Sequence, residues 1–495
     1  MANYTKTAVH GTLIVLVVSL LAAFFAYLVR LVLARNLPME EFGLFYAVFA
    51  FLGLFAIFST LGFDRALAKF IPEFLHEKKY SDIKSSISYS FIVQLLSNSI
   101  IILVVYALSN YLSSNYFHNE KAGIVLKIIV IAFFVDSFVQ VIKSSFQGFK
   151  KMVYFSGIDL ARMIILLTAI IIGIKLNLGI LGAATAYIIA PLILIIIFGI
   201  LLFKVFPEYA QAKVIFSRLL FKKMSKYSIF VLAASFAGFI LFYTDTIMLT
   251  YFAGLTSVAL YNVALPTAKL LLYFPRAIGG IFLPLTSEFW AKKENALLAA
   301  GVESLYKYSA IIIIPAVFII FSFSDLIINA FFGSNYAASS SALKILIVGM
   351  IFATINAIST NIFSGIGKPE INSKIIYSAA AFNFVGNLVM IPLWGINGAA
   401  FTTTLSYFIM MVMGLIDTRR FIAIKLPIFV WAKTLIAGLS LVGLIWILKK
   451  ALYLNLWLES GIILIVSGAV YAALLFSFKI ITLTEIKSIY SRIMN

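Results

Sequence analysis

Apolar runs of about 20 residues or more recur along the whole chain, separated by short polar segments. The first run, 11–34, is apolar on every face of a helix except at Arg30. A strand of a membrane barrel would instead show roughly 10-residue stretches in which polar and apolar side chains alternate. The pattern therefore predicts membrane-spanning helices. We expect about fourteen of them, at 11–34, 42–64, 89–112, 122–146, 153–174, 179–203, 227–252, 256–284, 304–326, 340–364, 374–393, 396–417, 427–448 and 457–479.

The composition supports this interpretation. Of 495 residues, 63% are hydrophobic and 12% are charged, whereas a soluble domain has about 45–50% apolar and about 25% charged residues. The sequence therefore excludes a soluble protein and predicts an all-α integral membrane protein. No small-residue cleavage site follows the first apolar run, so we expect a retained helix there rather than a signal peptide.

Basic residues are concentrated in alternate connections, those that follow even-numbered helices. They are Arg65, Lys69, Lys78, Lys79 and Lys84 after helix two, Lys143, Lys150 and Lys151 after helix four, Lys204, Lys213, Arg218, Lys222, Lys223 and Lys226 after helix six, and Arg419, Arg420, Lys425 and Lys433 after helix twelve. Lys175 stands alone in an odd-numbered connection, and the pair Lys449 and Lys450 breaks the rule. Because lysine and arginine accumulate in cytoplasmic loops, we expect both termini in the cytoplasm and a multi-pass protein of the plasma membrane. Orientation in the membrane thus accounts for the formal charge of +19, and nucleic-acid binding is not expected.

The two halves of the chain share short motifs at a nearly constant spacing. The motif Gly-Ile-x-Gly-Ala-Ala begins at Gly179 and again at Gly395, and 395 minus 179 is 216. At offsets of 215 to 217, Gly43-Leu44-Phe45 matches Ala259-Leu260-Tyr261, Glu73-Phe74 matches Glu288-Phe289, and Phe146-Gln147-Gly148 matches Phe363-Ser364-Gly365. One such match between apolar helices can arise by chance, but four in register favour an internal duplication.

Each repeat holds six helices, an even number, so both copies have the same orientation across the membrane. We predict an N-terminal lobe at 1–204 with helices one to six, and a cytoplasmic connector at 205–226. A C-terminal lobe with helices seven to twelve is expected at 227–425, and helices thirteen and fourteen with a cytoplasmic tail at 426–495. Two pseudo-symmetric lobes that face each other are typical of transporters, with the substrate path between them.

Several motifs together resemble a known family. They are the run from Leu33 to Leu44, the end of helix two at Leu61-Gly62-Phe63-Asp64-Arg65-Ala66, the segment from Phe146 to Met152, Tyr243-Thr244-Asp245, and Leu260-Tyr261-Asn262-Val263-Ala264. The chain resembles the polysaccharide-transporter branch of the multidrug/oligosaccharidyl-lipid/polysaccharide exporter superfamily, which includes flippases for lipid-linked sugars. The resemblance implies two helical bundles, alternating access and a lipid-linked oligosaccharide as substrate. Membrane lipids, and glycosyltransferases or a polymerase of the same pathway, are the partners it suggests.

Two charged residues occupy nearly equivalent positions in the two repeats. Arg30 lies in the outward part of helix one, and Asp245 lies in the matching part of helix seven, one position from the offset of 216. A charge in hydrocarbon costs at least about 2.5–3.5 kcal/mol and needs a partner or a wet cavity. One interpretation is a gate or ion-coupling site in which Arg30 and Asp245 pair in one state. The alternative is an arginine that extends to the interface and an aspartate that caps a helix end.

Further charges lie inside other spans. Lys269 and Arg276 are seven residues apart in helix eight, so a continuous helix would place them on one face, where they could bind the diphosphate of a lipid carrier. Arg30 is a further candidate for substrate binding, and so is Arg162 in helix five, unless Asp159 neutralises it. Asp136 in helix four is a candidate for gating or ion coupling. Helix eight also contains Pro266, Pro275 and Pro284, which predict kinks that either bend during transport or stay fixed.

The sequence offers nothing for chemical catalysis. It has no cysteine and only three isolated histidines, so we expect no metal site and no cofactor. Nucleotide-binding glycine loops, metalloprotease motifs and nucleophile elbows are absent, so an enzyme is not expected. The leading hypothesis is a flippase. A cation-coupled multidrug exporter of the same superfamily is the alternative, and an intramembrane glycosyltransferase would need larger outer loops than those near 111–121 and 327–340.

The predicted orientation can be tested directly because the chain has no native cysteine. Single cysteines placed in 205–226 should react with a membrane-impermeant maleimide only after the cells are opened, because this basic segment is expected in the cytoplasm. Cysteines near 111–121 should react in intact cells. Labelling of 205–226 from outside would show that the orientation is inverted.

Overall fold

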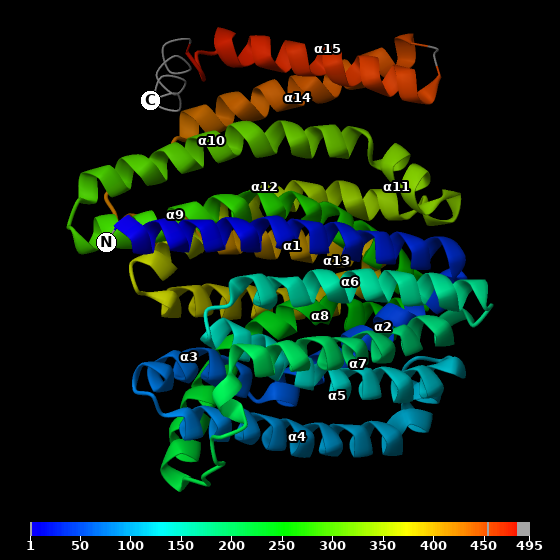
Figure 1. The fold of residues 1–495 in the computed structure, drawn as a ribbon. Coiled ribbons are helices and arrows are strands. Elements are labelled where there is room, and N and C mark those ends of the chain that lie inside the picture. The colour runs from blue at the N-terminus through cyan, green and yellow to red at the C-terminus, as the bar shows by residue number, and fades with distance from the viewer. Residues whose placement is uncertain (1, 453–454, 483–495) are drawn as a thin grey trace. The chain divides into compact units, whose positions relative to one another are not determined.

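The computed structural model describes residues 2–452 and 455–482, and every regular element in these residues is helical (Figure 1). The first part contains α1 Ala2–Asn36, α2 Met39–Thr60, α3 Phe63–His76, α4 Tyr80–Asn115, α5 Lys121–Gly148, α6 Met152–Lys175 and α7 Gly179–Val205. Then follow η1 Pro207–Tyr209, α8 Arg218–Lys269, η2 Leu270–Leu272, α9 Tyr273–Ala291, α10 Asn295–Ser322, α11 Ser324–Phe332, η3 Ser334–Tyr336, α12 Ser339–Gly365, α13 Pro369–Phe421, α14 Ile428–Ala451 and α15 Leu456–Ser477.

Twelve stretches of the described residues are long and apolar enough to cross a membrane. Two of them, which contain α8 and α13, are each broken by one glycine with a non-helical backbone, Gly254 (φ 77°, ψ 174°) and Gly395 (φ 54°, ψ −128°). These breaks coincide with the expected boundaries between helices seven and eight and between helices eleven and twelve. Counting each broken stretch as two helices gives fourteen, so the predicted fold class is confirmed.

Two local features add detail to the expected spans. Helix eight, expected as one element at 256–284, is interrupted by the 3₁₀ turn η2, which lies between two of its prolines. The polar segment after helix two contains a separate amphipathic helix, α3, whose Leu67, Phe70 and Phe74 are buried. Packing against neighbouring helices therefore stabilises α3, and the surface of the membrane is not the only partner of its apolar face.

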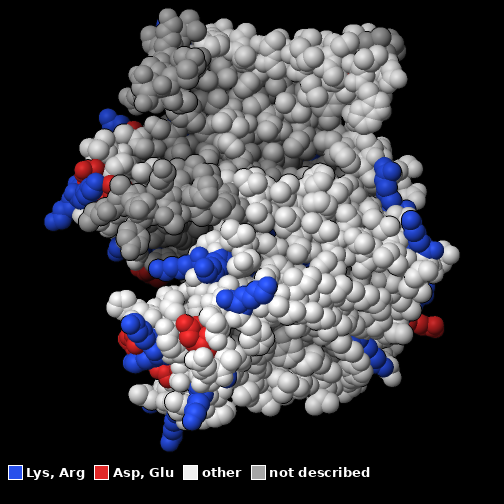
Figure 2. Space-filling model, in the orientation of Figure 1, with Lys and Arg blue, Asp and Glu red and all other residues white. Residues whose placement is uncertain are grey.

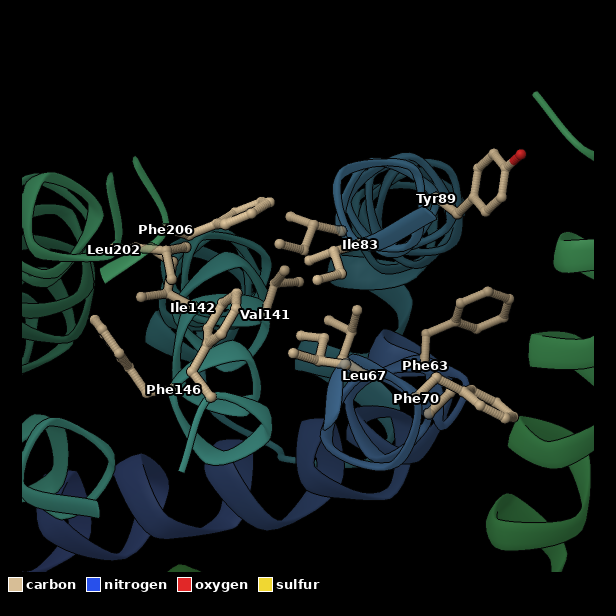
Figure 3. Close-up of a cluster of buried hydrophobic side chains, with 14 of the residues drawn as sticks. Phe63, Leu67, Phe70, Ile83, Tyr89, Val141, Ile142, Phe146, Leu202 and Phe206 are labelled. Atoms are coloured by element: carbon tan, nitrogen blue, oxygen red, sulfur yellow. The ribbon is translucent and has the colours of Figure 1, made fainter. Parts of the chain in front are cut away.

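The chain divides into two compact units, one with residues 1–262 and 380–399, the other with 263–379 and 400–495. In the first unit, side chains of α3, α4, α5 and α7 form a continuous buried cluster, drawn in Figure 3. In the second unit, α10, α14 and α15 share another cluster around Leu441 and Ile463. The lobes expected at 1–204 and 227–425 stay a prediction.

Charged side chains gather toward the ends of the helices on the face drawn in Figure 2, and the surface between them carries almost no charge. Large apolar side chains are exposed along α4, among them Ile92, Leu96, Ile100 and Leu103. An apolar surface of this extent is stable in lipid and would aggregate in water.

Equivalent turns of the two repeats have the same backbone conformation. Lys78 and Lys293 are 215 positions apart and have φ values of 56° and 60°, while Gly179 and Gly395 both have φ 54°. Each of the two lysines comes shortly after the end of a helix. The backbone N–H of the residue after Lys78 donates a hydrogen bond to the carbonyl oxygen of Phe74, and the N–H of the residue after Lys293 donates one to the carbonyl oxygen of Phe289. The internal match seen in the sequence is thus repeated in the local geometry.

The same equivalence holds for two tight helix contacts. A Cβ on Gly148 would lie 2.7 Å from Cβ of Ile71, and a Cβ on Gly365 would lie 2.6 Å from Cγ2 of Thr286. These two pairs occupy matching positions in the two repeats. Glycine is needed at both because the partner helix leaves no room for a side chain.

Glycines also bring α2 close to the first half of α8. A Cβ on Gly43 would lie 1.9 Å from the backbone oxygen of Leu255, and a Cβ on Gly53 would lie 2.4 Å from the ring of Tyr243. The two helices therefore run antiparallel in close contact. This packing fixes the depth of Asp245, which lies two residues after Tyr243.

Candidate coupling and substrate site

Asp245 is a buried carboxylate inside a membrane span, and only 4% of its surface is exposed. The hydroxyl of Tyr261 donates a hydrogen bond of 2.5 Å to its Oδ2, and the side-chain amide of Asn387 donates one of 2.7 Å to its Oδ1. The same Asn387 amide is 3.1 Å from the side-chain oxygen of Asn383. Both carboxylate oxygens of Asp245 thus have a donor from another part of the chain.

The glycine break in α8 creates this arrangement. Gly254 lies between Asp245 and Tyr261 and ends the first helical segment, so the chain returns and Tyr261 comes back beside Asp245. Asn387 belongs to the part of α13 before Gly395, which is the segment of the second half that joins the first compact unit. Oxygen atoms of a carboxylate and of amides are the ligands that hard cations prefer, and a carboxylate can also take up a proton.

Arg30 reaches the same part of α8 from α1. Its Nη1 donates a hydrogen bond of 2.5 Å to the backbone oxygen of Asn262, and its guanidinium lies 4.1 Å from the centre of the Tyr46 ring. Asn262 is the direct neighbour of Tyr261, the donor to Asp245. The structure therefore brings Arg30 and Asp245 to adjacent residues of one helix, and their direct pairing in another state of the protein stays a prediction.

A second group of charges joins α5 to α6. Arg162 Nη2 is 2.8 Å from Asp136 Oδ1, and the amide of Gln140 donates a hydrogen bond of 3.0 Å to Asp136 Oδ2. Lys143 donates to both oxygens of Asp159 at 2.7 Å. The two aspartates are thus paired with cations across the helix contact, and the alternative pairing of Arg162 with Asp159 is not the one observed.

Lys269 and Arg276 do not lie on one continuous helix. Lys269 is the last residue of α8, and Arg276 is in the first turn of α9, beyond η2. Three residues of 3₁₀ helix turn by about 120° each instead of about 100°, so Arg276 is rotated by roughly 60° from the expected face. Arg276 is exposed, and its guanidinium lies 5.3 Å from the ring of Tyr273, while Lys269 is half-buried. A shared role of the two residues in binding substrate stays a prediction.

The sequence analysis missed the partners of Asp245. Asn383 and Asn387 are four residues apart in the expected span 374–393, so they lie on one face of that helix, and both are fully buried. Two amides with this spacing in hydrocarbon are a signal of a polar contact between helices. Tyr261 carried no such signal, because tyrosine is common throughout this chain.

Solved structures with the same fold are membrane transporters. One described as "Lipid II flippase MurJ, inward closed conformation" has a TM-score of 0.71 and 15% identity, and the similarity covers 92% of this chain and 97% of that one. Another, an inward-facing "multidrug resistance MATE family transporter of the MOP superfamily", has a TM-score of 0.67 and 15% identity over 81% and 94% of the two chains. The chain therefore shares the fold of these two proteins.

Residues 8–290 match the family described as "Polysaccharide biosynthesis protein". An uncharacterized membrane protein of Methanocaldococcus jannaschii is 35% identical over 99% of both chains. The chain belongs to this polysaccharide biosynthesis family, as its motifs had suggested.

A relative in Haloferax volcanii, named "Probable low-salt glycan biosynthesis flippase Agl15", is 22% identical over 92% of this chain and 93% of its own. Another relative, in Shigella flexneri, is named "Putative O-antigen transporter" and is 22% identical over 74% of this chain and 87% of its own.

The pairing of Asp136 with Arg162 predicts how the two residues respond to substitution. Arg162→Gln alone should lower the free energy of unfolding by about 1–3 kcal/mol, because it leaves the carboxylate of Asp136 with an amide as its only polar partner. Adding Asp136→Asn should recover most of that loss. Thermal unfolding of the purified variants measures both effects, with the exposed Lys175→Gln as a control that removes one positive charge. If both Arg162 variants unfold like the wild type but fail in transport, Arg162 acts on the substrate instead.

Proposed function

We propose that this protein is an alternating-access flippase that moves a lipid diphosphate-linked oligosaccharide from the cytoplasmic to the outer leaflet. The product would serve the assembly of surface polysaccharide or glycoconjugates. The full-length similarity to a relative named as a glycan biosynthesis flippase supports this proposal. We also propose that the protein lies in the plasma membrane with both termini in the cytoplasm, which the distribution of basic residues supports. Glycosyltransferases or a polymerase of the pathway are candidate partners.

The observation that carries the choice of substrate is the state of the arginines inside the spans. Within the described residues, Arg30 and Arg276 contact rings and a backbone oxygen, and neither forms an ion pair with a carboxylate. Arg162, in contrast, is paired with Asp136. A guanidinium in hydrocarbon without an anionic partner is costly, and the oxygens of a diphosphate would supply that partner through charge-assisted hydrogen bonds.

A cation-coupled multidrug exporter is the second candidate, favoured by the similarity of the fold to a multidrug transporter. Such an exporter would more naturally use carboxylates to bind a cationic drug. In this chain the buried Asp245 already accepts hydrogen bonds from Tyr261 and Asn387. That arrangement suits a coupling role for Asp245 better than direct contact with a bulky drug.

We predict that Asp245→Asn uncouples transport from its driving gradient, because the amide cannot carry the negative charge that a proton or a cation would neutralise. Transport by the wild type in proteoliposomes should increase when a proton or sodium gradient is imposed, and transport by the variant should not. The double variant Asp136→Asn with Arg162→Gln is a matched control that removes the other candidate carboxylate. An undiminished response of Asp245→Asn would exclude Asp245 as the coupling residue, and loss of the response in the double variant would assign coupling to Asp136.

We also predict that the double variant Lys269→Gln with Arg276→Gln folds but does not flip its substrate. Glutamine keeps both side chains polar and removes the charges that would bind a diphosphate. The measurement is the accumulation of lipid-linked oligosaccharide on the cytoplasmic leaflet in cells that contain this variant as their only copy. A control with Lys175→Gln and Arg419→Gln removes the same charges from exposed helix ends.

Two outcomes would contradict this prediction in different ways. Normal surface polysaccharide at a matched protein level would show that Lys269 and Arg276 do not bind the substrate. Export of cationic dyes by the wild type, without any effect of its deletion on lipid-linked sugars, would support the multidrug exporter instead.

A further inference from the structure

The connector between α7 and α8 lies on the end of α4 and is held there by side chains of α4 (Figure 1). Lys84 Nζ donates hydrogen bonds to the backbone oxygens of Tyr209 and Ala212, at 2.7 and 2.9 Å. One residue further on, the hydroxyl of Ser85 accepts a hydrogen bond of 2.9 Å from the backbone N–H of Ile215. The connector is thus fixed to α4 at several points of its backbone.

Tyr89 completes this attachment one helical turn later. It points outward from α4, away from Val141 and Ile142 (Figure 3). Its hydroxyl accepts a hydrogen bond of 2.6 Å from the N–H of Ser217 and donates one of 3.0 Å to the oxygen of Ile215. Because the backbone of the connector is bound, the direction of the intervening side chain, Phe216, is set as well.

A cavity of about 430 Å³ lies nearby between the start of α4 and the connector, but most of the residues that line it, among them Lys78, Asp82 and Gln211, are polar. A second cavity, of about 360 Å³, lies between α4 and the start of α8 and is different in character. Ile92, Val93, Phe216 and Phe221 give it an apolar wall, and Arg218 is among the residues that line it. An apolar wall with one guanidinium beside it suits a ligand that has a hydrocarbon chain and an anionic headgroup.

The surroundings of this second cavity are apolar and exposed. Phe216 is 74% exposed and Leu219 is 80% exposed, which would be unfavourable for a segment surrounded by water. Ile92 continues into the exposed apolar side chains of α4, including Leu95 and Leu96, which a membrane protein turns toward lipid. The cavity therefore opens beside the hydrocarbon of the bilayer rather than toward a soluble partner.

Arg218 is exposed and has neither a hydrogen bond nor an ion pair with the described residues. Its neighbour on the same helix, Lys223, contrasts with it, because Lys223 is paired with Glu73 at 2.5 Å. Lys213 and Lys222 add further positive charge along the connector and the start of α8. Basic groups next to a membrane attract anionic lipids, and a guanidinium binds a phosphate through two parallel hydrogen bonds.

From this geometry we propose that α4, the connector and the first turn of α8 form a binding site for one anionic phospholipid of the adjacent leaflet. Arg218 binds the phosphate of the headgroup. A hydrocarbon chain of the same lipid lies in the cavity against Ile92, Phe216 and Phe221. This site is separate from the residues assigned to the transported substrate, and it does not depend on which cargo the protein carries.

Native mass spectrometry of the purified protein can test the site, with phosphatidylglycerol as the anionic probe and phosphatidylcholine as the neutral one. We expect Arg218→Gln to weaken binding of phosphatidylglycerol about fivefold and to leave phosphatidylcholine unaffected, because one basic residue near the headgroups contributes on the order of a fivefold change in affinity. Arg419→Gln is the matched control, because Arg419 is also exposed at a helix end. It should have no effect.

A second variant tests the hydrocarbon part of the site. Phe216→Ala removes an exposed ring, so folding should be kept, and binding of phosphatidylglycerol should again be weaker without any change in charge. Equal losses in Arg218→Gln and Arg419→Gln would show that only the net charge attracts the lipid, and the proposed site would be wrong. Unchanged binding of phosphatidylglycerol by Phe216→Ala would show that the hydrocarbon chain of the lipid does not lie in this cavity. Conversion of a dimer to a monomer by Phe216→Ala would identify a second copy of the protein as the occupant.

Discussion

A polar group inside hydrocarbon must find its partner within the protein, because no water is available to replace it. This constraint explains why the spans are helical, since a helix satisfies its own backbone. It also explains where the helices break. Gly254 and Gly395 adopt backbone angles that a helix does not allow, and both lie between two spans rather than inside one.

The same constraint determines how the charges inside the spans are arranged. Asp136 and Asp159 are paired with cations on the neighbouring helix, and Asp245 is held by a tyrosine and an asparagine. The break in α8 contributes directly, because it returns the chain and brings Tyr261 back to Asp245. Neutral side chains of Tyr261 and Asn387 donate hydrogen bonds to Asp245, whereas Asp136 and Asp159 are each paired with a cation.

At matching positions of the two predicted repeats the backbone is alike and the chemistry differs. Matching turns at Lys78 and Lys293 have the same left-handed conformation, and matching contacts at Gly148 and Gly365 leave no room for a side chain. At nearly equivalent depths, however, one repeat has Arg30 and the other has Asp245. Packing limits what can change at a tight contact, whereas the charge at nearly equivalent positions differs in sign between the two repeats.

The sequence by itself determined the class of protein, the number and limits of most spans, and the duplication, because these depend on the length and spacing of apolar runs and on where glycine is required. It also identified Asp245 and Asp136 as unusual, since a charge in an apolar run is visible without a structure. The tertiary structure decided which groups these charges contact. Tyr261 reaches Asp245 across the break in α8, and Asn387 reaches it from α13. Arg162 is paired with Asp136 on the neighbouring helix and not with Asp159, which is nearer in sequence. These partners are far apart along the chain. The periodicity of one helix shows which of its residues share a face, but it does not show which side chain of another helix packs against that face.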